Sequence, residues 1–211
     1  MNKDNLKEIL LQSVLQEDNQ IWHPSEYKFF GPSTRALNFS SEVISETITP
    51  LISQILELEQ MDPEEPIYLY LNTEGGSLTD GLALYDTIKN VSCPVIVIVT
   101  GLCASAGLVI LSAADYAMAT SNSVFFYHQP IISQGPINSV SDMQSLSSHY
   151  DYCSTVADDI LKKKTKMKKT TWNNNFKDKT SFYFDAEKAL EFNLIDSLVE
   201  SRKVKFKIER G

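Results

Sequence analysis

Two uninterrupted runs of β-forming residues restrict the fold of this chain more than any other feature. Residues 67–71 read Ile-Tyr-Leu-Tyr-Leu, residues 95–99 read Val-Ile-Val-Ile-Val, and turn-forming residues bound both runs. Such runs are typical of strands that are buried on both faces of a parallel sheet. Because apolar residues recur at helical spacing over 82–88, the segment 67–99 is predicted to form a β-α-β unit with a right-handed crossover.

The rest of the chain continues this alternation of strands and helices. Apolar periodicity predicts a helix from Val43 to about Met61, with Pro50 as its one discordant residue. Shorter patterns predict the following elements: helices at 106–114 and 186–190, and strands at 116–119, 124–127 and 204–208. Strands that alternate with helices indicate an α/β fold.

Composition bounds the number of domains and the classes of partner. The 211 residues are 43% hydrophobic, and no linker divides them into two comparable halves, so we expect an N-terminal arm (1–33) and a single domain (34–211). The net charge of −8 argues against nucleic acid or an anionic membrane as a partner. The basic run 162–169 fits a solvated helix end, although it also resembles a nucleic-acid patch.

Cysteine usage and the N-terminus indicate the compartment. Cys93, Cys103 and Cys153 are odd in number and irregularly spaced, which fits neither a disulfide framework nor a zinc site. We therefore expect no metal and a reducing compartment. The N-terminus lacks the apolar stretch of a signal peptide, and no run approaches about 18 apolar residues, so we expect a cytoplasmic protein without a membrane partner.

One serine and one histidine stand out as candidates for nucleophilic chemistry. Ser105 lies among small residues (Gly101-Leu102-Cys103-Ala104-Ser105-Ala106-Gly107) where a buried helix is expected to open. The small neighbours would let a substrate backbone approach, and the free amides of a helix start favour developing negative charge. The alternative is that Ser105 only caps the helix. His128 ends a predicted strand, a place where catalytic side chains are commonly presented.

A second turn offers further backbone amides. Gly75-Gly76 follows the buried strand 67–71 and precedes a helix, a geometry that suits an oxyanion or a phosphate equally well. The spacing matches neither the dinucleotide-binding nor the P-loop glycine pattern. Serine needs an adjacent base and oxyanion donors to act as a nucleophile, so the three segments together favour acyl-transfer chemistry.

As a set, these residues resemble the proteolytic subunit of the Clp protease. The resemblance rests on the segments 68–77 (Tyr-Leu-Tyr-Leu-Asn-Thr-Glu-Gly-Gly-Ser), 81–88, 104–107 (Ala-Ser-Ala-Gly), 128–130 (His-Gln-Pro) and 186–196, and it covers about residues 34–200. It implies a ClpP/crotonase-like fold, a spiral of β-β-α units with a protruding handle helix at about 133–169. In that helix, apolar residues recur at three- and four-residue steps from Met143 to Leu161, a stripe that fits burial either within the chain or against a neighbouring subunit.

The same resemblance implies a serine-type endopeptidase. Ser105 would be the nucleophile, His128 the general base, and the backbone amides of Gly75 and Ala106 the oxyanion hole. The subunit would assemble with itself into two stacked heptameric rings, a tetradecamer, and degrade unfolded polypeptides inside the chamber. No cofactor is expected in the subunit, because a separate AAA+ unfoldase would use the ATP.

The chain departs from the family pattern at the third position of the triad. The expected aspartate aligns with Ser181, and Asp178 lies three residues away. Glu74 replaces a proline common before the two glycines, and the arm does not resemble the family's axial loop. These departures keep a second interpretation open, a weak or inactive scaffold subunit of a mixed ring. A third is a crotonase-like enzyme acting on a coenzyme A thioester, for which no acyl-carrier feature is present.

Overall fold

The computed structural model describes residues 35–129, 139–177 and 181–199, and the described strands form one sheet. Neighbouring strands run parallel in the order β1-β2-β3-β4-β7. A further strand, β5, pairs in parallel with the end of β3 and antiparallel with β6. The strands are β1 (Ala36–Ser40), β2 (Ile67–Thr73), β3 (Val95–Ala104), β4 (Tyr116–Ala119), β5 (Val124–His128), β6 (Ser181–Asp185) and β7 (Ser197–Leu198).

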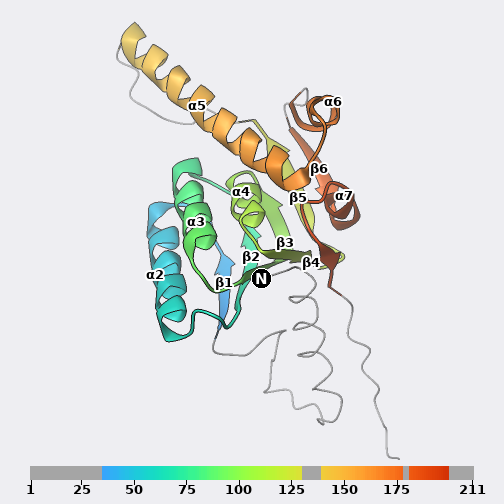
Figure 1. Cartoon of the computed structure of the whole chain (residues 1–211). Coiled ribbons are helices and arrows are strands. Elements are labelled where there is room, and N and C mark those ends of the chain that lie inside the picture. The colour runs from blue at the N-terminus through green and yellow to red at the C-terminus, as the bar shows by residue number, and fades with distance from the viewer. Residues whose placement is uncertain (1–34, 130–138, 178–180, 200–211) are drawn as a thin grey trace, which may run out of the picture.

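Helices pack against this sheet, and one of them extends well beyond it. Figure 1 shows α2, α3 and α4 lying beside one another against the strands, while α5 projects past the body of the molecule. The helices are α2 (Ser45–Met61), α3 (Leu78–Asn90), α4 (Ala106–Ser112), α5 (Val140–Thr165), α6 (Lys169–Trp172) and α7 (Ala186–Glu191), with a π-helical turn, η1 (Asn173–Lys177), after α6. This mixed, mostly parallel architecture is the predicted α/β fold.

The central strand β3 is buried on both faces, as its sequence predicts. Val95, Val97 and Val99 belong to the main core, under the helices. Ile96 and Ile98 point to the other face, where they pack in a second cluster that contains Tyr68 and Tyr116. Strands β2 and β3 pair in parallel, and α3 connects them in the sequence. The predicted β-α-β unit is therefore confirmed.

Several boundaries differ from the sequence-based predictions. The helix expected from Val43 begins at Ser45, because Val43 forms a β-bridge with Gly76. The segment expected to open a helix at Gly101 instead continues β3 as far as Ala104. There the amide of Leu102 donates to the side chain of Asn72, which holds the segment against β2. The predicted strand 204–208 and the arm 1–33 lie outside the described residues.

A buried arginine fixes the start of β1 to the C-terminal end of α2. The Arg35 side chain is only 3% exposed, and its guanidinium donates to four backbone carbonyls. The acceptors are the carbonyl oxygens of Leu58, Asp62, Glu65 and Pro66. One planar cation thus ties the last turn of α2 to the loop that follows it, because its donors reach several carbonyl oxygens at once.

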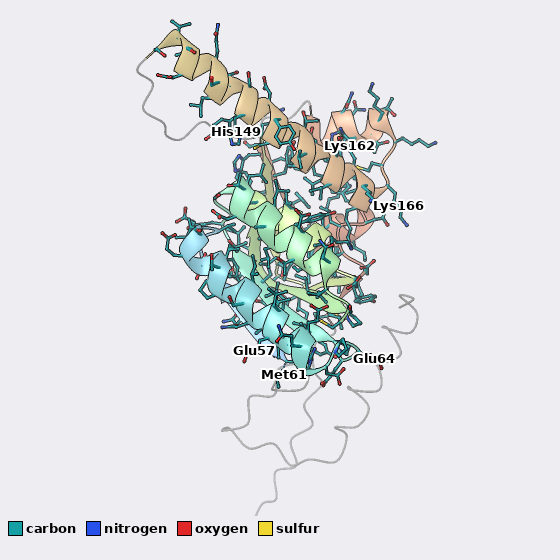
Figure 2. All side chains as sticks on the ribbon, turned by 60° about the vertical axis from the view of Figure 1, so that its left-hand side comes forward. Glu57, Met61, Glu64, His149, Lys162 and Lys166 are labelled. Carbon is teal, nitrogen blue, oxygen red and sulfur yellow. The ribbon has the colours of Figure 1, made fainter. Side chains whose placement is uncertain are left out.

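The predicted handle helix is confirmed over α5, and the apolar stripe divides into two halves. Cys153 and Leu161 are buried, whereas Met143, nearer the N-terminal end, is 55% exposed. Figure 2 shows His149 partway along the projecting helix and Lys162 close to the body. The C-terminal half therefore packs within the chain, and the N-terminal half leaves apolar surface uncovered by the described residues.

Candidate active site

Ser105 lies at the sharp junction between β3 and α4. Its backbone has φ 54° and ψ −119°, a region that a non-glycine residue occupies only at a cost of about 1–3 kcal/mol. The Ser105 amide donates to the carbonyl of Phe126 at 2.9 Å, which ties the junction to β5. The hydroxyl makes no capping hydrogen bond to α4, so the alternative in which Ser105 only caps the helix is wrong. The side chain is partly exposed.

Gly75 and Ala106 flank Ser105 closely. A Cβ added to Gly75 would lie 2.7 Å from Ser105 Cβ and 3.1 Å from the Ala106 nitrogen, and its φ of +91° suits glycine. Ala106 is the first residue of α4, so its amide has no acceptor within the helix. The Gly75 amide, in contrast, already donates to Thr73 Oγ1 at 3.0 Å. The structure thus brings both predicted oxyanion donors to the serine and leaves only one of them unengaged.

The glycine turn is held rigidly from its outer side. The Val43 amide donates to the Gly75 carbonyl and the Ser77 amide donates to the Val43 carbonyl, each at 2.7 Å. The Thr73 hydroxyl donates to the carbonyl of Ser41 at 2.6 Å. Neighbouring backbone therefore fixes the turn, and the Gly75 amide keeps its direction without help from a ligand.

His128 ends β5, as predicted, and its ring is held by the next residue. Nδ1 lies 2.7 Å from the carbonyl oxygen of Gln129. A carbonyl can only accept, so Nδ1 carries the hydrogen and Nε2 of the neutral ring presents its lone pair. The ring centroid lies 5.4 Å from that of Phe126. The backbone thus selects the tautomer in which Nε2 can accept a proton.

The sheet register places the histidine near the serine. Ala104 and Phe126 are partners in the β3–β5 pair, so Ser105 immediately follows one partner and His128 lies two residues beyond the other. Both are described residues, and the structure contains no hydrogen bond between the Ser105 hydroxyl and the His128 ring. Such bonds are often long before a substrate or partner organises the site.

Ser181 lies directly opposite His128. The two residues are partners at the end of the antiparallel β5–β6 pair, and Ser181 is exposed. Ser181, which stands in place of the expected aspartate, therefore occupies the position from which an acid would face the imidazole. Asp178, the other candidate, lies outside the described residues. Strand β6 was not predicted from the sequence, so this pairing could not have been found in advance.

Other groups of catalytic type lie elsewhere. His149 is on α5, where its ring contacts the Cys153 sulfur, and His23 lies outside the described residues. Complete burial raises the pKa of the Cys103 thiol, which keeps it uncharged and unreactive. Within the described ranges, no cluster of histidine, cysteine, aspartate and glutamate suited to a metal ion is found.

Comparison with known proteins decides the family. A family model described as Clp protease matches residues 31–202. The ATP-dependent Clp protease proteolytic subunit of Bdellovibrio bacteriovorus is 32% identical over 181 residues, covering 81% of each chain. The ATP-dependent Clp protease proteolytic subunit 1 of Prochlorococcus marinus is 31% identical over 174 residues, covering 81% of this chain and 86% of the relative.

The chain belongs to the Clp protease family. The resemblance seen in the sequence is thereby confirmed, together with the ClpP-like α/β fold. The matched range contains Gly75, Ser105, Ala106 and His128, as well as Ser181. As a separate observation, no helix in the described part of this Clp family member is long and apolar enough to cross a membrane.

Proposed function

We propose that this chain is a serine endopeptidase, the proteolytic subunit of a Clp-type protease. The observation that supports this most is the strained, partly exposed Ser105, whose hydroxyl makes no capping hydrogen bond and whose backbone lies close to Gly75 and precedes Ala106. A strained backbone persists only where its surroundings enforce it, and such residues cluster at active sites. The proposed nucleophile is Ser105, the general base is His128, and the oxyanion donors are the amides of Ala106 and Gly75.

In the proposed reaction, His128 Nε2 accepts the hydroxyl proton while Ser105 Oγ attacks the carbonyl carbon of a peptide bond. The carbonyl oxygen becomes an oxyanion and accepts hydrogen bonds from the two amides. The imidazolium then gives its proton to the departing amine, which leaves an acyl-serine. Water, deprotonated by the same imidazole, hydrolyses that ester and frees Ser105.

The Gln129 carbonyl takes over part of the role of the absent acid. In a triad the acid fixes the imidazole tautomer and stabilises the imidazolium. The 2.7 Å contact with the carbonyl supports the first role fully. It supports the second only weakly, because a neutral acceptor stabilises a cation less than a carboxylate does. We therefore expect slow but measurable turnover.

The second oxyanion donor needs a local change. To bind the oxyanion, the Gly75 amide must share or give up its hydrogen bond to Thr73 Oγ1. One oxyanion donor contributes about 10²–10³ in turnover where it has been removed. We infer that the described state is a resting state and that substrate or assembly completes the site.

Assembly into rings is the event that we propose completes the site and frees the Gly75 amide. The N-terminal half of α5 exposes Val140, Met143 and Tyr152 at 76%, 55% and 67%, an area that suits a contact with another copy. We propose that the subunit forms stacked heptameric rings and receives unfolded polypeptides from an AAA+ unfoldase, since its relatives are named as ATP-dependent proteolytic subunits. The three free cysteines fit a reducing cytoplasm.

A second function, a catalytically inactive scaffold of a mixed ring, has its own support. Ser181 stands where an acid would face His128, and Ser105 and His128 share no hydrogen bond. The scaffold hypothesis predicts that the chain co-assembles with an active relative and that replacing Ser105 changes nothing. Failure to recover mixed rings with such a relative would count against it.

Labelling with an active-site-directed fluorophosphonate separates the two functions. The purified assembly is incubated with the probe, and mass spectrometry locates the adduct. The peptidase hypothesis predicts modification of Ser105 that is lost in His128→Ala. An assembled ring in which Ser105 stays unmodified would exclude the peptidase and leave the scaffold.

A further inference from the structure

The last two residues of β5 have a strand neighbour on one side only. Among the described residues, β5 pairs with β3 as far as Phe126 and no further. Tyr127 and His128 continue the pairing with β6, where their partners are Phe182 and Ser181. Because the proposed general base is the final residue of the strand, its position depends on what else holds this strand end.

The side chain of Tyr127 holds the strand end from the core side. Tyr127 is 5% exposed, and its aromatic ring meets those of Trp172 and Phe176 edge to face. The ring centroids are 6.4 Å and 5.1 Å apart, at interplanar angles of 83° and 87°. Such edge-to-face pairs add attraction beyond the area that they bury. The residue that directly precedes His128 is therefore fixed by aromatic packing.

The hydroxyl of Tyr127 is bonded to the long helix α5. It donates to Asp158 Oδ1 at 3.1 Å, a contact between residues 31 positions apart. Burial and the charge of Asp158 raise the pKa of Tyr127, so the hydroxyl keeps its proton and remains a donor. Asp158 is half-buried, and Lys162, one turn further along α5, lies close to the body in Figure 2. The bond thus joins the end of β5 to the packed half of the helix, and its charged acceptor makes it a strong one.

The same helix contacts the element that follows the proposed nucleophile. Helix α5 packs against α4, and α4 begins directly after Ser105. One helix therefore touches both the junction that carries Ser105 and the residue before His128. The structure contains no hydrogen bond between the serine hydroxyl and the imidazole, and proton transfer needs the two groups within about 2.6–3.2 Å. A small displacement of the end of β5 therefore decides whether they meet.

We propose that Tyr127 is a positioning residue, whose hydrogen bond to Asp158 holds the end of β5 so that His128 can reach Ser105. The inference rests on the proposed peptidase function and adds to it a residue that touches neither substrate nor nucleophile. A misplacement of about 1 Å can lower a reaction rate about 10²-fold, so loss of this bond is expected to reduce kcat about ten-fold or more. A buried tyrosine hydroxyl needs a partner in any fold, and only a kinetic measurement separates positioning from stability.

The experiment measures kcat and KM separately for one fluorogenic peptide with the assembled wild type and variants of the pair. Tyr127→Phe removes the hydroxyl and keeps the aromatic ring, so kcat should fall about ten-fold or more at unchanged KM. Asp158→Ala removes the acceptor and should have the same effect. Asp158→Asn keeps an oxygen that accepts the hydrogen bond and should restore most of kcat. The double variant Tyr127→Phe/Asp158→Ala should be no slower than either single variant, because the two side chains act as one unit.

Tyr85→Phe is the matched control. Tyr85 is a half-buried tyrosine of α3 that packs against the main core, and loss of its hydroxyl should leave kcat and KM unchanged. The rate of fluorophosphonate labelling at Ser105 is a second measurement, because it reports activation of the nucleophile without peptide binding. It should fall in Tyr127→Phe by the same factor as kcat.

Three outcomes would overturn the proposal. These are an unchanged kcat in both Tyr127→Phe and Asp158→Ala, an effect on KM alone, and a loss of kcat that Asp158→Asn does not restore. Failure of both Tyr127→Phe and Asp158→Asn to assemble would show a structural role and overturn it as well. A wild type that neither cleaves the peptide nor reacts with a fluorophosphonate refutes the peptidase function itself, and the proposal with it. An active wild type with equally active variants refutes the proposal alone.

Discussion

Restoring an acid opposite the imidazole is the most informative perturbation that the structure suggests. Ser181 and His128 are directly opposite in the β5–β6 pair, where Cβ atoms are separated by about 4.5–5.5 Å. A carboxylate at position 181 can therefore approach Nδ1, which now donates to the Gln129 carbonyl. Because Ser181 is exposed, Ser181→Asp should fold normally.

The size of the gain follows from the bond that is exchanged. A hydrogen bond to a charged partner contributes about 1.5–3 kcal/mol and a neutral one about 0.5–1.5 kcal/mol, a difference of about 1–1.5 kcal/mol. Since 1.36 kcal/mol corresponds to a factor of ten in rate, kcat/KM should rise about ten-fold. Loss of a triad aspartate costs about 10⁴ elsewhere. The gain here is smaller because the Gln129 carbonyl already holds the tautomer.

The assay is hydrolysis of a fluorogenic peptide by assembled wild type, Ser181→Asp and Ser181→Asn. The asparagine variant has the same shape without the charge and should show no gain. The acid limb of the pH–rate profile should move to higher pH only in Ser181→Asp, because a facing carboxylate favours the protonated imidazole. Equal activities of the aspartate and asparagine variants would show that charge compensation is not the missing element.

Three further predictions concern backbone, stability and pH. Gly75→Ala should abolish peptide cleavage, because the added Cβ would lie 2.7 Å from the Ala104 carbonyl oxygen and from Ser105 Cβ. In the control variant Gly81→Ala the nearest contact of the added Cβ is 3.3 Å, so most of the activity should remain. Comparable activity of the two variants would contradict this prediction. Arg35→Met should lower the free energy of unfolding by about 2–5 kcal/mol in a urea titration, since four carbonyls lose a charged donor. An unchanged midpoint and slope of the unfolding curve would show that the buried guanidinium adds nothing to stability. Desolvation raises the pKa of Tyr70 from 10.0 to about 12, so the unfolded chain loses this proton first and stability should fall between about pH 10 and 12. Tyr70→Phe should flatten that fall in denaturation curves recorded across this range, and an equally steep loss in the variant would assign the alkaline effect to other groups.

The sequence was sufficient for elements whose pattern is local. The runs 67–71 and 95–99, the periodicity before Met61 and the turn at Gly75 each carry their own signal, and the structure has the expected element at each place. Short pieces were missed because their stability comes from partners distant in sequence. Strand β1 has one buried residue, Phe39, and β6 exists as a strand through its pairing with β5.

The features of the candidate site also divide into those that the local sequence reveals and those that depend on the fold. Ser105, His128 and the glycine turn could be selected because residue type and local context point to chemistry. The positive φ of Ser105 and the hydrogen bond from Gly75 to Thr73 could not be inferred, because they arise from the packing of β2 against the β3–α4 junction. The facing position of Ser181 likewise depends on a strand register that only the fold supplies.

The proposed peptidase function requires Ser105 to be a working nucleophile in the assembled protein. The most direct measurement compares peptide hydrolysis by purified wild type and Ser105→Ala, with ring assembly of both verified by size-exclusion chromatography with light scattering. The wild type should cleave the peptide slowly and the variant not above background, at unchanged assembly. Equal rates in the two proteins, whether both zero or both measurable, would contradict it.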